Sequence, residues 1–219
     1  MKSVPTSDEG VSPRRKNDPD RVKRNIIEVA TAEFASNGLS GARVDEIAAK
    51  TATSKRMIYY YFGSKEGLYL AVLEQAYAGI RSLDSGVEFD GLPPDVALRR
   101  LVEITFDYHE ANPDFIRLVS IENIHRAEHL RRSATIRSIN DTAIEGLAGI
   151  LKRGQKAGLF RPDIDPLDVH LLISALCFFR VSNRSTFSAI FDVDFAARKT
   201  RESQRKLVVE AVVRLVLKK

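Results

Sequence analysis

An apolar stripe with helical spacing is the feature that most limits what this chain can fold into. Between residues 130 and 157 its members follow one another mostly at steps of three and four residues: Ile136, Ile139, Ala143, Ile144, Leu147 and Leu151. That spacing places them on one face of an α-helix that packs on a core. No segment shows the alternation of apolar and polar residues that a half-buried strand requires. We therefore predict an all-α protein.

Glycine, proline and capping residues divide the chain into helices. Asp18 before Pro19 is an N-cap with proline at the first helical position, and Gly38 is a stop signal. The expected helices span residues 19–37, 43–50, 54–62, 65–83, 95–111, 114–126, 130–157, 167–183 and 200–217, whereas 184–198 has no clear assignment. The two short helices, split by a small turn and braced by the helix 65–83, form a helix-turn-helix.

This organisation predicts three parts. Residues 1–17, rich in Ser, Pro, Gly and charge, are expected to form a flexible arm. Residues 18–66 are expected to be a helix-turn-helix DNA-binding head, and residues 67–219 a helical body that binds a ligand and dimerises. The run Arg14-Arg15-Lys16 in the arm is either solvated charge or a contact with phosphate or the minor groove.

Composition indicates an ordinary globular protein. Of the 219 residues, 44% are hydrophobic and 29% charged, which argues against global disorder. The single cysteine, Cys177, excludes an internal disulfide and favours a reducing compartment. The first 18 residues lack the apolar stretch of a signal peptide, and the most hydrophobic segment, 169–179, is far shorter than the ~20 residues that span a bilayer. We expect a cytoplasmic protein without membrane association.

The basic charge of the chain is concentrated near its N-terminus. The formal net charge is +5, and residues 11–67 hold 11 Lys and Arg against 7 Asp and Glu. A local excess of this size permits nucleic-acid binding without requiring it. Charge alone therefore leaves the function open, and the residues of the helix-turn-helix provide the more specific evidence.

The second short helix has the pattern of a recognition helix. Such a helix shows its N-terminal residues to base edges in the major groove while its back packs on the head. Lys55, Arg56 and Met57 lie at its N-terminal end, and Tyr60 follows Arg56 by one turn. The back is expected to be Ile58 and Phe62. Tyr59 and Tyr61 flank the reading face, where a phenol hydroxyl can donate to phosphate.

The stretch from 41 to 68, GARVDEIAAKTATSKRMIYYYFGSKEGL, resembles the DNA-binding head of the TetR family of transcriptional regulators. The matching elements are Ile47-Ala48, the small turn 51–53, Ser54, the aromatic run 59–62 and Lys65-Glu66-Gly67-Leu68. The resemblance implies that Tyr59 and Lys65 contact phosphates. It implies that Lys55, Arg56, Met57 and Tyr60 read base edges.

Two positions depart from the family pattern. The turn reads Thr51-Ala52-Thr53 where Ala-Gly-Val is common, and a positive φ at Ala52 would carry strain that glycine avoids. Arg43 stands where a threonine commonly caps the second helix, and it could reach a phosphate instead. The expected DNA-binding residues are Arg43, Ser54, Lys55, Arg56, Met57, Tyr59, Tyr60, Tyr61 and Lys65.

The last two helices carry more apolar surface than one core can use. Residues 167–179 are apolar almost all round, and the last helix has two apolar edges: Leu207, Val208, Ala211, Val212 and Leu215 on one, Val209, Val213 and Val216 beside it. A helix that is apolar on two sides must bury both. The family resemblance implies a homodimer through these helices. Its two heads would read a palindromic operator in double-stranded DNA at half-sites about 34–36 Å apart.

The resemblance also implies a small-molecule effector, bound in the body, whose binding weakens the hold on the operator. The candidate pocket residues are Phe106, His109, Phe115, Ile121, Glu122, His125, Phe178 and Phe179, each of which could equally be a core residue. His125 and His129, four residues apart, raise the question of a metal. Since spacing fixes no third ligand, we expect no metal and no cofactor.

The leading interpretation is thus a repressor that an effector releases from its operator. One alternative is a dimeric regulator without an effector. Another is a helical enzyme, although the chain has no glycine-rich phosphate loop, nucleophile elbow or His-Glu-x-x-His motif, so no catalytic residues are expected. A lipid-surface role is disfavoured because the basic residues lie among groove-reading aromatics.

Overall fold

A computed structural model describes residues 18–85 and 89–218 of the protein, and within them the fold is helical without a strand. The expected arm, with Arg14-Arg15-Lys16, lies outside the described residues. The elements are α1 (Pro19–Gly41), α2 (Val44–Lys50), α3 (Lys55–Phe62), α4 (Lys65–Ser85), η1 (Phe89–Gly91), α5 (Pro94–Ala111), α6 (Pro113–Ile124), η2 (Leu130–Arg132), α7 (Ala134–Lys156), α8 (Pro166–Ser182), α9 (Arg184–Phe191) and α10 (Arg198–Val216). The prediction of an all-α protein is confirmed.

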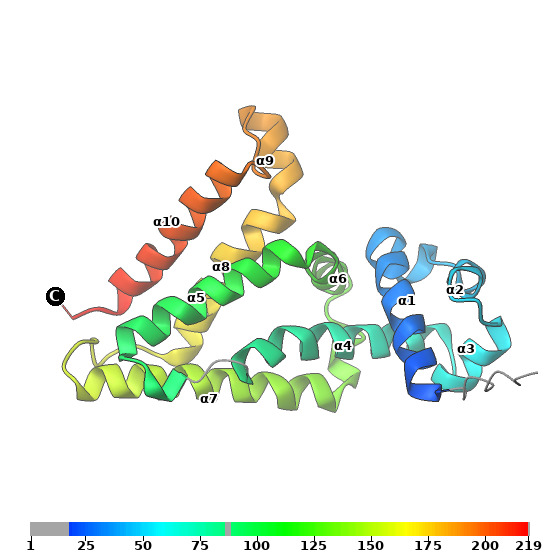
Figure 1. Cartoon of the computed structure of the whole chain (residues 1–219), viewed down its shortest axis with the longest axis horizontal. Helices are drawn as coiled ribbons and strands as arrows, with labels where there is room; N and C mark the ends of the chain where they lie inside the picture. Colours follow the sequence, from blue (N-terminus) through cyan, green and yellow to red (C-terminus); the bar gives the residue numbers. More distant parts are fainter. Residues whose placement is uncertain (1–17, 86–88, 219) are drawn as a thin grey trace, which may run out of the picture.

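The helices form a small head at one end of an elongated body (Figure 1). Helices α1, α2 and α3 gather around the first turns of α4, which runs from the head into the body. In the body α5 packs against α7, α8 and α10, while α6 packs against both α1 and α8. In the described part of the chain, no helix combines the length and the apolar character that crossing a membrane requires.

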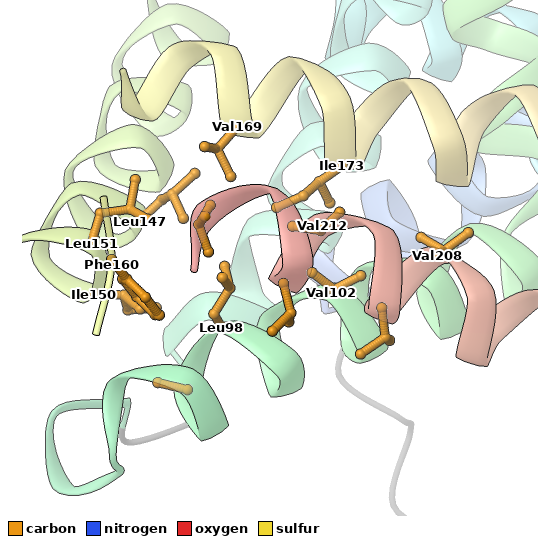
Figure 2. Close-up of a cluster of buried hydrophobic side chains, with 14 of the residues drawn as sticks. Leu98, Val102, Leu147, Ile150, Leu151, Phe160, Val169, Ile173, Val208 and Val212 are labelled. Atoms are coloured by element: carbon orange, nitrogen blue, oxygen red, sulfur yellow. The ribbon is translucent and has the colours of Figure 1, made fainter. Parts of the chain in front are cut away.

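The body core is built where α5, α7, α8 and α10 meet (Figure 2). Leu98 and Val102 of α5 face Val208 and Val212 of α10. Phe160, just after α7, closes one end of this core, and its ring lies so near Gly154 that a Cβ there would overlap it. Burying a large aliphatic side chain contributes about 1.5–3 kcal/mol, so this cluster is the main stabilising element of the body.

The head core extends into the body. Its fully buried members include Phe34 of α1, Ile47 of α2 and Ile58 of α3. Leu118 of α6 and Ile136 of α7 pack into the same cluster. Head and body are therefore joined by a continuous apolar core as well as by the backbone of α4.

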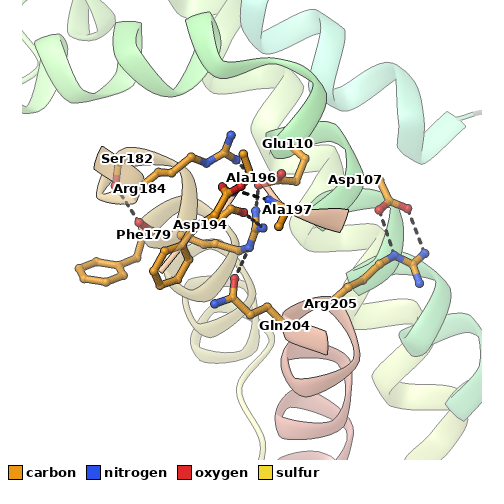
Figure 3. Close-up of polar contacts among 12 residues, drawn as sticks. Asp107, Glu110, Phe179, Ser182, Arg184, Asp194, Ala196, Ala197, Gln204 and Arg205 are labelled. Carbon is orange, nitrogen blue, oxygen red and sulfur yellow. Dashed lines mark hydrogen bonds and ion pairs between the residues drawn. The ribbon is translucent and has the colours of Figure 1, made fainter. Parts of the chain in front are cut away.

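Two sets of polar contacts, one largely buried and one partly exposed, tie the outer helices to α5 (Figure 3). Glu110 of α5 is paired with Arg180 of α8 and accepts from the Arg184 guanidinium at 2.6 Å. Arg205 of α10 donates to both carboxylate oxygens of Asp107 at 2.9 Å. Arg180 and Glu110 are largely buried, and buried ionic groups are costly unless paired, whereas the Asp107 carboxylate is half exposed. Together the contacts connect α8, α9 and α10 to α5.

The expected helix ends hold to within a few residues, with three informative differences. Helix α1 continues past the predicted stop to Gly41, but Gly38 has φ 65° and kinks it there. The expected helix 130–157 is divided, because the Ser133 hydroxyl accepts from the Ile136 N–H at 3.1 Å and begins α7 anew. The unassigned stretch contains α9, whose Phe187 ring packs on the rings of Phe179 and Phe195.

The turn between α2 and α3 contains backbone strain. Ala52 has φ 50°, the left-handed conformation that costs an L-residue about 1–2 kcal/mol. We expect Ala52→Gly to raise the free energy of unfolding by about 1 kcal/mol, and the melting temperature by about 2–4 °C. Urea and thermal unfolding at fixed protein concentration would measure the gain.

A matched control for this substitution lies three residues earlier. Ala49 is exposed within α2, so Ala49→Gly should lower stability by about 1 kcal/mol through helix propensity alone. Opposite signs for the same chemical change are the expected result. Equal losses at both positions would show that Ala52 is unstrained in solution.

Candidate nucleic-acid interface

Helix α3 is a short exposed helix that is anchored on one side. The Ser54 hydroxyl caps it by accepting from the Met57 N–H at 3.2 Å. Ile58 on its inner face is fully buried in the head core. Lys55 and Arg56 at its N-terminal end are exposed. The side chains of this end are thus available to a partner while the back of the helix is held in place.

The small turn sets the position of α3 against α2. The Thr51 hydroxyl donates to the carbonyl of Ile47 at 2.8 Å and closes the end of α2. Across the turn, the Lys55 ammonium lies 3.1 Å from a carboxylate oxygen of Asp45. Both side chains of this ion pair are about half exposed, and pairs of that kind are weak. A phosphate or a base edge could therefore compete with Asp45 for Lys55.

Two glycines allow α4 to begin immediately after α3. Gly63 has φ 76°, and a Cβ at Gly67 would overlap the carbonyl oxygen of Phe62. The Ser64 hydroxyl accepts from the Gly67 N–H at 3.0 Å, and the Lys65 ammonium donates to the Ser40 carbonyl at 3.3 Å. Lys65 thereby stands at a helix N-terminus, where free N–H groups attract anions.

The three tyrosines of α3 have different surroundings, as their spacing of roughly 100° around a helix requires. Tyr60 is 77% exposed and Tyr59 37% exposed. Tyr61 is half-buried, and its ring lies edge-on to that of Tyr60 with 5.3 Å between the ring centres. The Lys23 ammonium lies 5.5 Å from the centre of the Tyr61 ring. Tyr61 is thus held by the head, while the other two remain open.

Glu33 organises the corner between α1 and α2, and sequence reasoning had no signal that would select it. This carboxylate is 8% exposed and accepts from the Asn37 amide at 3.0 Å and from the Arg43 backbone N–H at 3.2 Å. The Arg43 side chain makes no helix cap and is 69% exposed, 4.0 Å from Glu46. Its side chain is accordingly directed to solvent.

A cavity of about 350 Å³ lies in the body between α4, α5, α6, α7 and α8. Three of the predicted pocket residues, His109, Phe115 and Phe178, line it. Sequence reasoning missed most of the polar lining, which comes from five helices: Arg81, Thr105, Asn123, Asn140, His170 and Ser174. The one available signal was that His170 and Ser174 interrupt an otherwise apolar helix.

The other predicted pocket residues lie elsewhere. Phe115, Val119 and Asn123 face the cavity at steps of four, so the remaining positions of α6 point to other sides of the helix. The residues displaced from the cavity are Phe106, Ile121, Glu122, His125 and Phe179. Phe106 packs in the body core under Arg180, and Phe179 is half exposed on the outer side of α8.

Glu122 has a structural position at the junction of head and body. It is 1% exposed and accepts from the backbone N–H groups of His129 and Leu130, each at 3.1 Å. Its other oxygen lies 3.1 Å from the His129 Nδ1, and the Tyr69 ring packs edge-on to that imidazole. His125 is exposed at the end of α6. Among the described side chains, no three His, Cys, Asp or Glu are arranged to hold a metal ion.

An exposed recognition helix with a cationic end, held on a three-helix head, is the arrangement by which helix-turn-helix proteins enter the major groove. This fold and site define a DNA-binding transcriptional regulator. Residues 26–72 match the family model described as bacterial regulatory proteins of the tetR family, and residues 94–212 match the tetracyclin repressor-like C-terminal domain.

Individual relatives agree with these matches. The HTH-type transcriptional repressor NicS of Pseudomonas putida is 36% identical over 200 residues, covering 91% of this chain and 94% of NicS. The crystal structure of the transcriptional regulator SCO4942 of Streptomyces coelicolor superposes with a TM-score of 0.67 at 30% identity, covering 89% and 98% of the two chains. KstR2 of Mycobacterium tuberculosis, at 20% identity, a TM-score of 0.67 and coverage of 90% and 95%, shares the fold. The chain belongs to the TetR family.

Proposed function

We propose that the protein is a homodimeric repressor that binds a palindromic operator and is released from it by a small molecule bound in the body cavity. The observation that carries the DNA-binding part is the exposed cationic end of α3 above a buried anchor. The names of the relatives NicS and SCO4008, both called repressors, support the direction of regulation. SCO4008 of Streptomyces coelicolor is 31% identical over 171 residues, covering 73% of this chain and 78% of the relative.

The proposed roles at the DNA follow from where each side chain lies. Lys55, Arg56, Met57 and Tyr60 read base edges, and an arginine can bind a guanine through two hydrogen bonds. Tyr59, Tyr61, Lys65 and Arg43 contact phosphates, and Ser54 holds the start of α3. The exposure of Tyr60 and the helix-terminal position of Lys65 support this division.

Lys65→Ala should weaken binding to operator and to unrelated DNA alike. A phosphate contact carries no sequence information, and each one contributes about one unit to the slope of log K against log salt. We expect that slope to flatten by about one unit per head while the ratio of specific to non-specific affinity stays constant. Fluorescence anisotropy with an operator and a scrambled duplex, across a salt series, would measure both.

The control is Lys152→Ala, which removes the same charge from the exposed side of α7. This variant should keep the wild-type slope. A Lys65→Ala protein that loses discrimination at constant salt slope would instead make Lys65 a base reader.

The dimer proposal rests on an apolar stripe left open on the outer helices. On α8 it runs along one face through Leu167, Leu171 and Phe179, at intervals of four and eight residues; these side chains are 61%, 65% and 50% exposed. On α10 Leu207 and Leu215 continue it, being 65% and 41% exposed. The valines beside them are buried in the body core. An open stripe of this kind is typical of a protein interface, and a second copy of the same helices is the proposed cover.

Leu171→Asp should convert the dimer to a monomer and abolish high-affinity operator binding. The exposed site tolerates aspartate in a free chain, whereas the dimer would bury two unpaired charges at a cost of several kcal/mol each. Sedimentation at micromolar concentration would measure the oligomeric state. Ile124→Asp, at a 76% exposed position at the end of α6, is the matched control and should stay dimeric. A wild-type protein that sediments as a stable monomer would refute the proposal.

The effector proposal rests on two helices that line the cavity and also pack against the head. Tyr77 and Ile80 of α4, and Phe115 and Val119 of α6, line the cavity. The same two helices pack against α1. A ligand that contacts α4 and α6 can therefore favour one placement of the head, provided that it binds the two states with different affinity.

A thermal-shift screen followed by operator binding tests this part. A ligand that binds only the native protein must raise the melting temperature. Compounds that do so should also weaken operator binding. If compounds raise the melting temperature without changing operator affinity, the body of the protein only dimerises. That outcome would favour the alternative of a dimeric regulator without an effector.

A further inference from the structure

The charge of the cavity lining is one-sided. Among the described residues that line it, Arg81 is the one side chain with a permanent charge, and Asp and Glu are absent. The carboxylates on the adjoining face of α5 are already held, Glu110 by Arg180 and Asp107 by Arg205. Arg81 is therefore the one permanently charged group that a ligand would meet among the described residues of the lining.

The two histidines of the lining do not alter that balance near neutral pH. Burial, with a smaller effect from Arg81, lowers the pKa of His109 to about 4 and lowers the pKa of His170 as well. Both imidazoles are thus neutral, and Arg81 supplies the charge. A guanidinium has five N–H donors in a planar fork, so it can bind a carboxylate through two hydrogen bonds beside any contact it makes within the protein.

The lining and the volume of the cavity favour a small aromatic ligand. The aromatic lining includes Tyr77, Phe115 and Phe178, with the first two rings edge-to-face at 5.4 Å between centres. Aromatic side chains pack most favourably on another aromatic ring. A volume of about 350 Å³ lies at the lower end of the range of about 300–1,000 Å³ that is usual for ligand pockets. That size favours a compact ligand such as a single ring with short substituents.

His109 adds a second polar requirement. Its side chain is 4% exposed, and its Nδ1 has no hydrogen-bond partner in the part of the chain that the structure describes. A buried polar atom is normally paired, so this nitrogen is a position where a ligand group fits. A hydroxyl suits it because a hydroxyl can either donate or accept, whichever ring nitrogen carries the proton.

We propose that the effector is a monocyclic aromatic carboxylate with a ring hydroxyl, bound by Arg81 at its carboxylate, by Tyr77, Phe115 and Phe178 around its ring, and by His109 at its hydroxyl. This assignment rests on the proposed function, because it names the ligand of the same effector site. It commits to an anionic ligand of small size, which separates it from neutral, cationic or lipid-like ligands.

The test uses the full-length protein and three probes in isothermal titration calorimetry. 4-Hydroxybenzoate has every proposed feature, 4-hydroxybenzamide lacks the charge, and cyclohexanecarboxylate lacks the aromatic ring and the hydroxyl. We expect the dissociation constant of 4-hydroxybenzoate to be at least tenfold lower than that of either other probe. This comparison uses wild-type protein, so it does not depend on a variant that folds.

Variants then locate the binding. Arg81→Gln should raise the dissociation constant of 4-hydroxybenzoate at least tenfold and remove its advantage over the amide. Benzoate, added here as a fourth probe, lacks only the ring hydroxyl. His109→Phe should leave benzoate binding nearly unchanged and should remove the extra affinity of 4-hydroxybenzoate over benzoate. Arg117→Gln, on the exposed side of α6, is the matched control and should bind like wild type. The melting temperature of each free variant reports whether it is folded.

The outcomes separate this proposal from the proposed function. Equal affinity for acid and amide, or no binding of the acid at millimolar concentration, would overturn the assignment of the ligand. If a neutral or lipid-like compound bound the cavity and released the operator, the effector function would stand and the ligand assignment would fail. If 4-hydroxybenzoate bound through Arg81 but left operator affinity unchanged, the ligand assignment would stand and the effector function would fail.

Discussion

Arg56→Ala is expected to lower the affinity of the dimer for its operator by at least about 30-fold and to reduce its preference for operator over unrelated DNA. A two-bonded contact from arginine to guanine is worth about 1–3 kcal/mol of discrimination, and a dimer makes it twice. Arg56 is exposed at the end of α3 that faces away from the head core, which is the position such a contact requires. Lys55→Ala should act in the same direction but less strongly, because Lys55 must first leave Asp45.

Anisotropy titrations with operator and scrambled duplexes at one salt concentration would measure the ratio of operator affinity to non-specific affinity directly. Lys152→Ala again controls for the loss of one positive charge. Unchanged operator affinity in Arg56→Ala, Lys55→Ala and Lys65→Ala together would show that the reading surface lies elsewhere on the protein.

Glu122→Ala should lower the free energy of unfolding by about 2–5 kcal/mol. The carboxylate is buried and accepts from two backbone N–H groups and from the His129 imidazole. Removing it leaves those donors without a partner in a site that is closed to water, which is among the more destabilising effects of a single substitution. Urea unfolding at a fixed protein concentration would measure the loss.

Two control variants isolate the cause. Glu122→Gln keeps one acceptor oxygen of similar size and should lose distinctly less stability than the alanine variant. Glu128→Ala removes an exposed carboxylate paired with Arg132 in the same connecting segment, and such pairs contribute about 0–1 kcal/mol. Equal losses in all three variants would mean that the segment, and not the buried carboxylate, determines stability.

Local signals were sufficient to predict the fold class and the head. Ser54, Gly63 and the apolar positions of α3 act within a few residues of one another, so their effect can be read from spacing. The capping of α1 by Asp18 is equally local: its carboxylate accepts from the Asp20 and Arg21 N–H groups. Helix ends and the exposure of Lys55 and Arg56 follow from such contacts.

The cavity could not be predicted in the same way, because its lining depends on how helices rotate against one another. Helix α6 has apolar residues on several sides, and only packing against α1 and α8 decides that Phe115 faces the cavity while Glu122 faces the η2 segment. Helix α9 was not predicted for the same reason. Its Phe187 packs against Phe179 and Phe195, and such contacts cannot be read from local spacing. Arg81 reaches the lining from the C-terminal half of α4, where the sequence pattern marked no binding residue.

Because Leu118 and Ile136 of the body belong to the head core, the head is not an independent unit that can be exchanged alone. A graft of residues 18–66 onto a foreign scaffold would expose the apolar surface that those two side chains normally cover, and it would cut α4 at its second residue. New operator preferences should therefore arise by exchange of a few outward side chains on α3. Whole-segment swaps would succeed only between proteins that also match at α6 and α7.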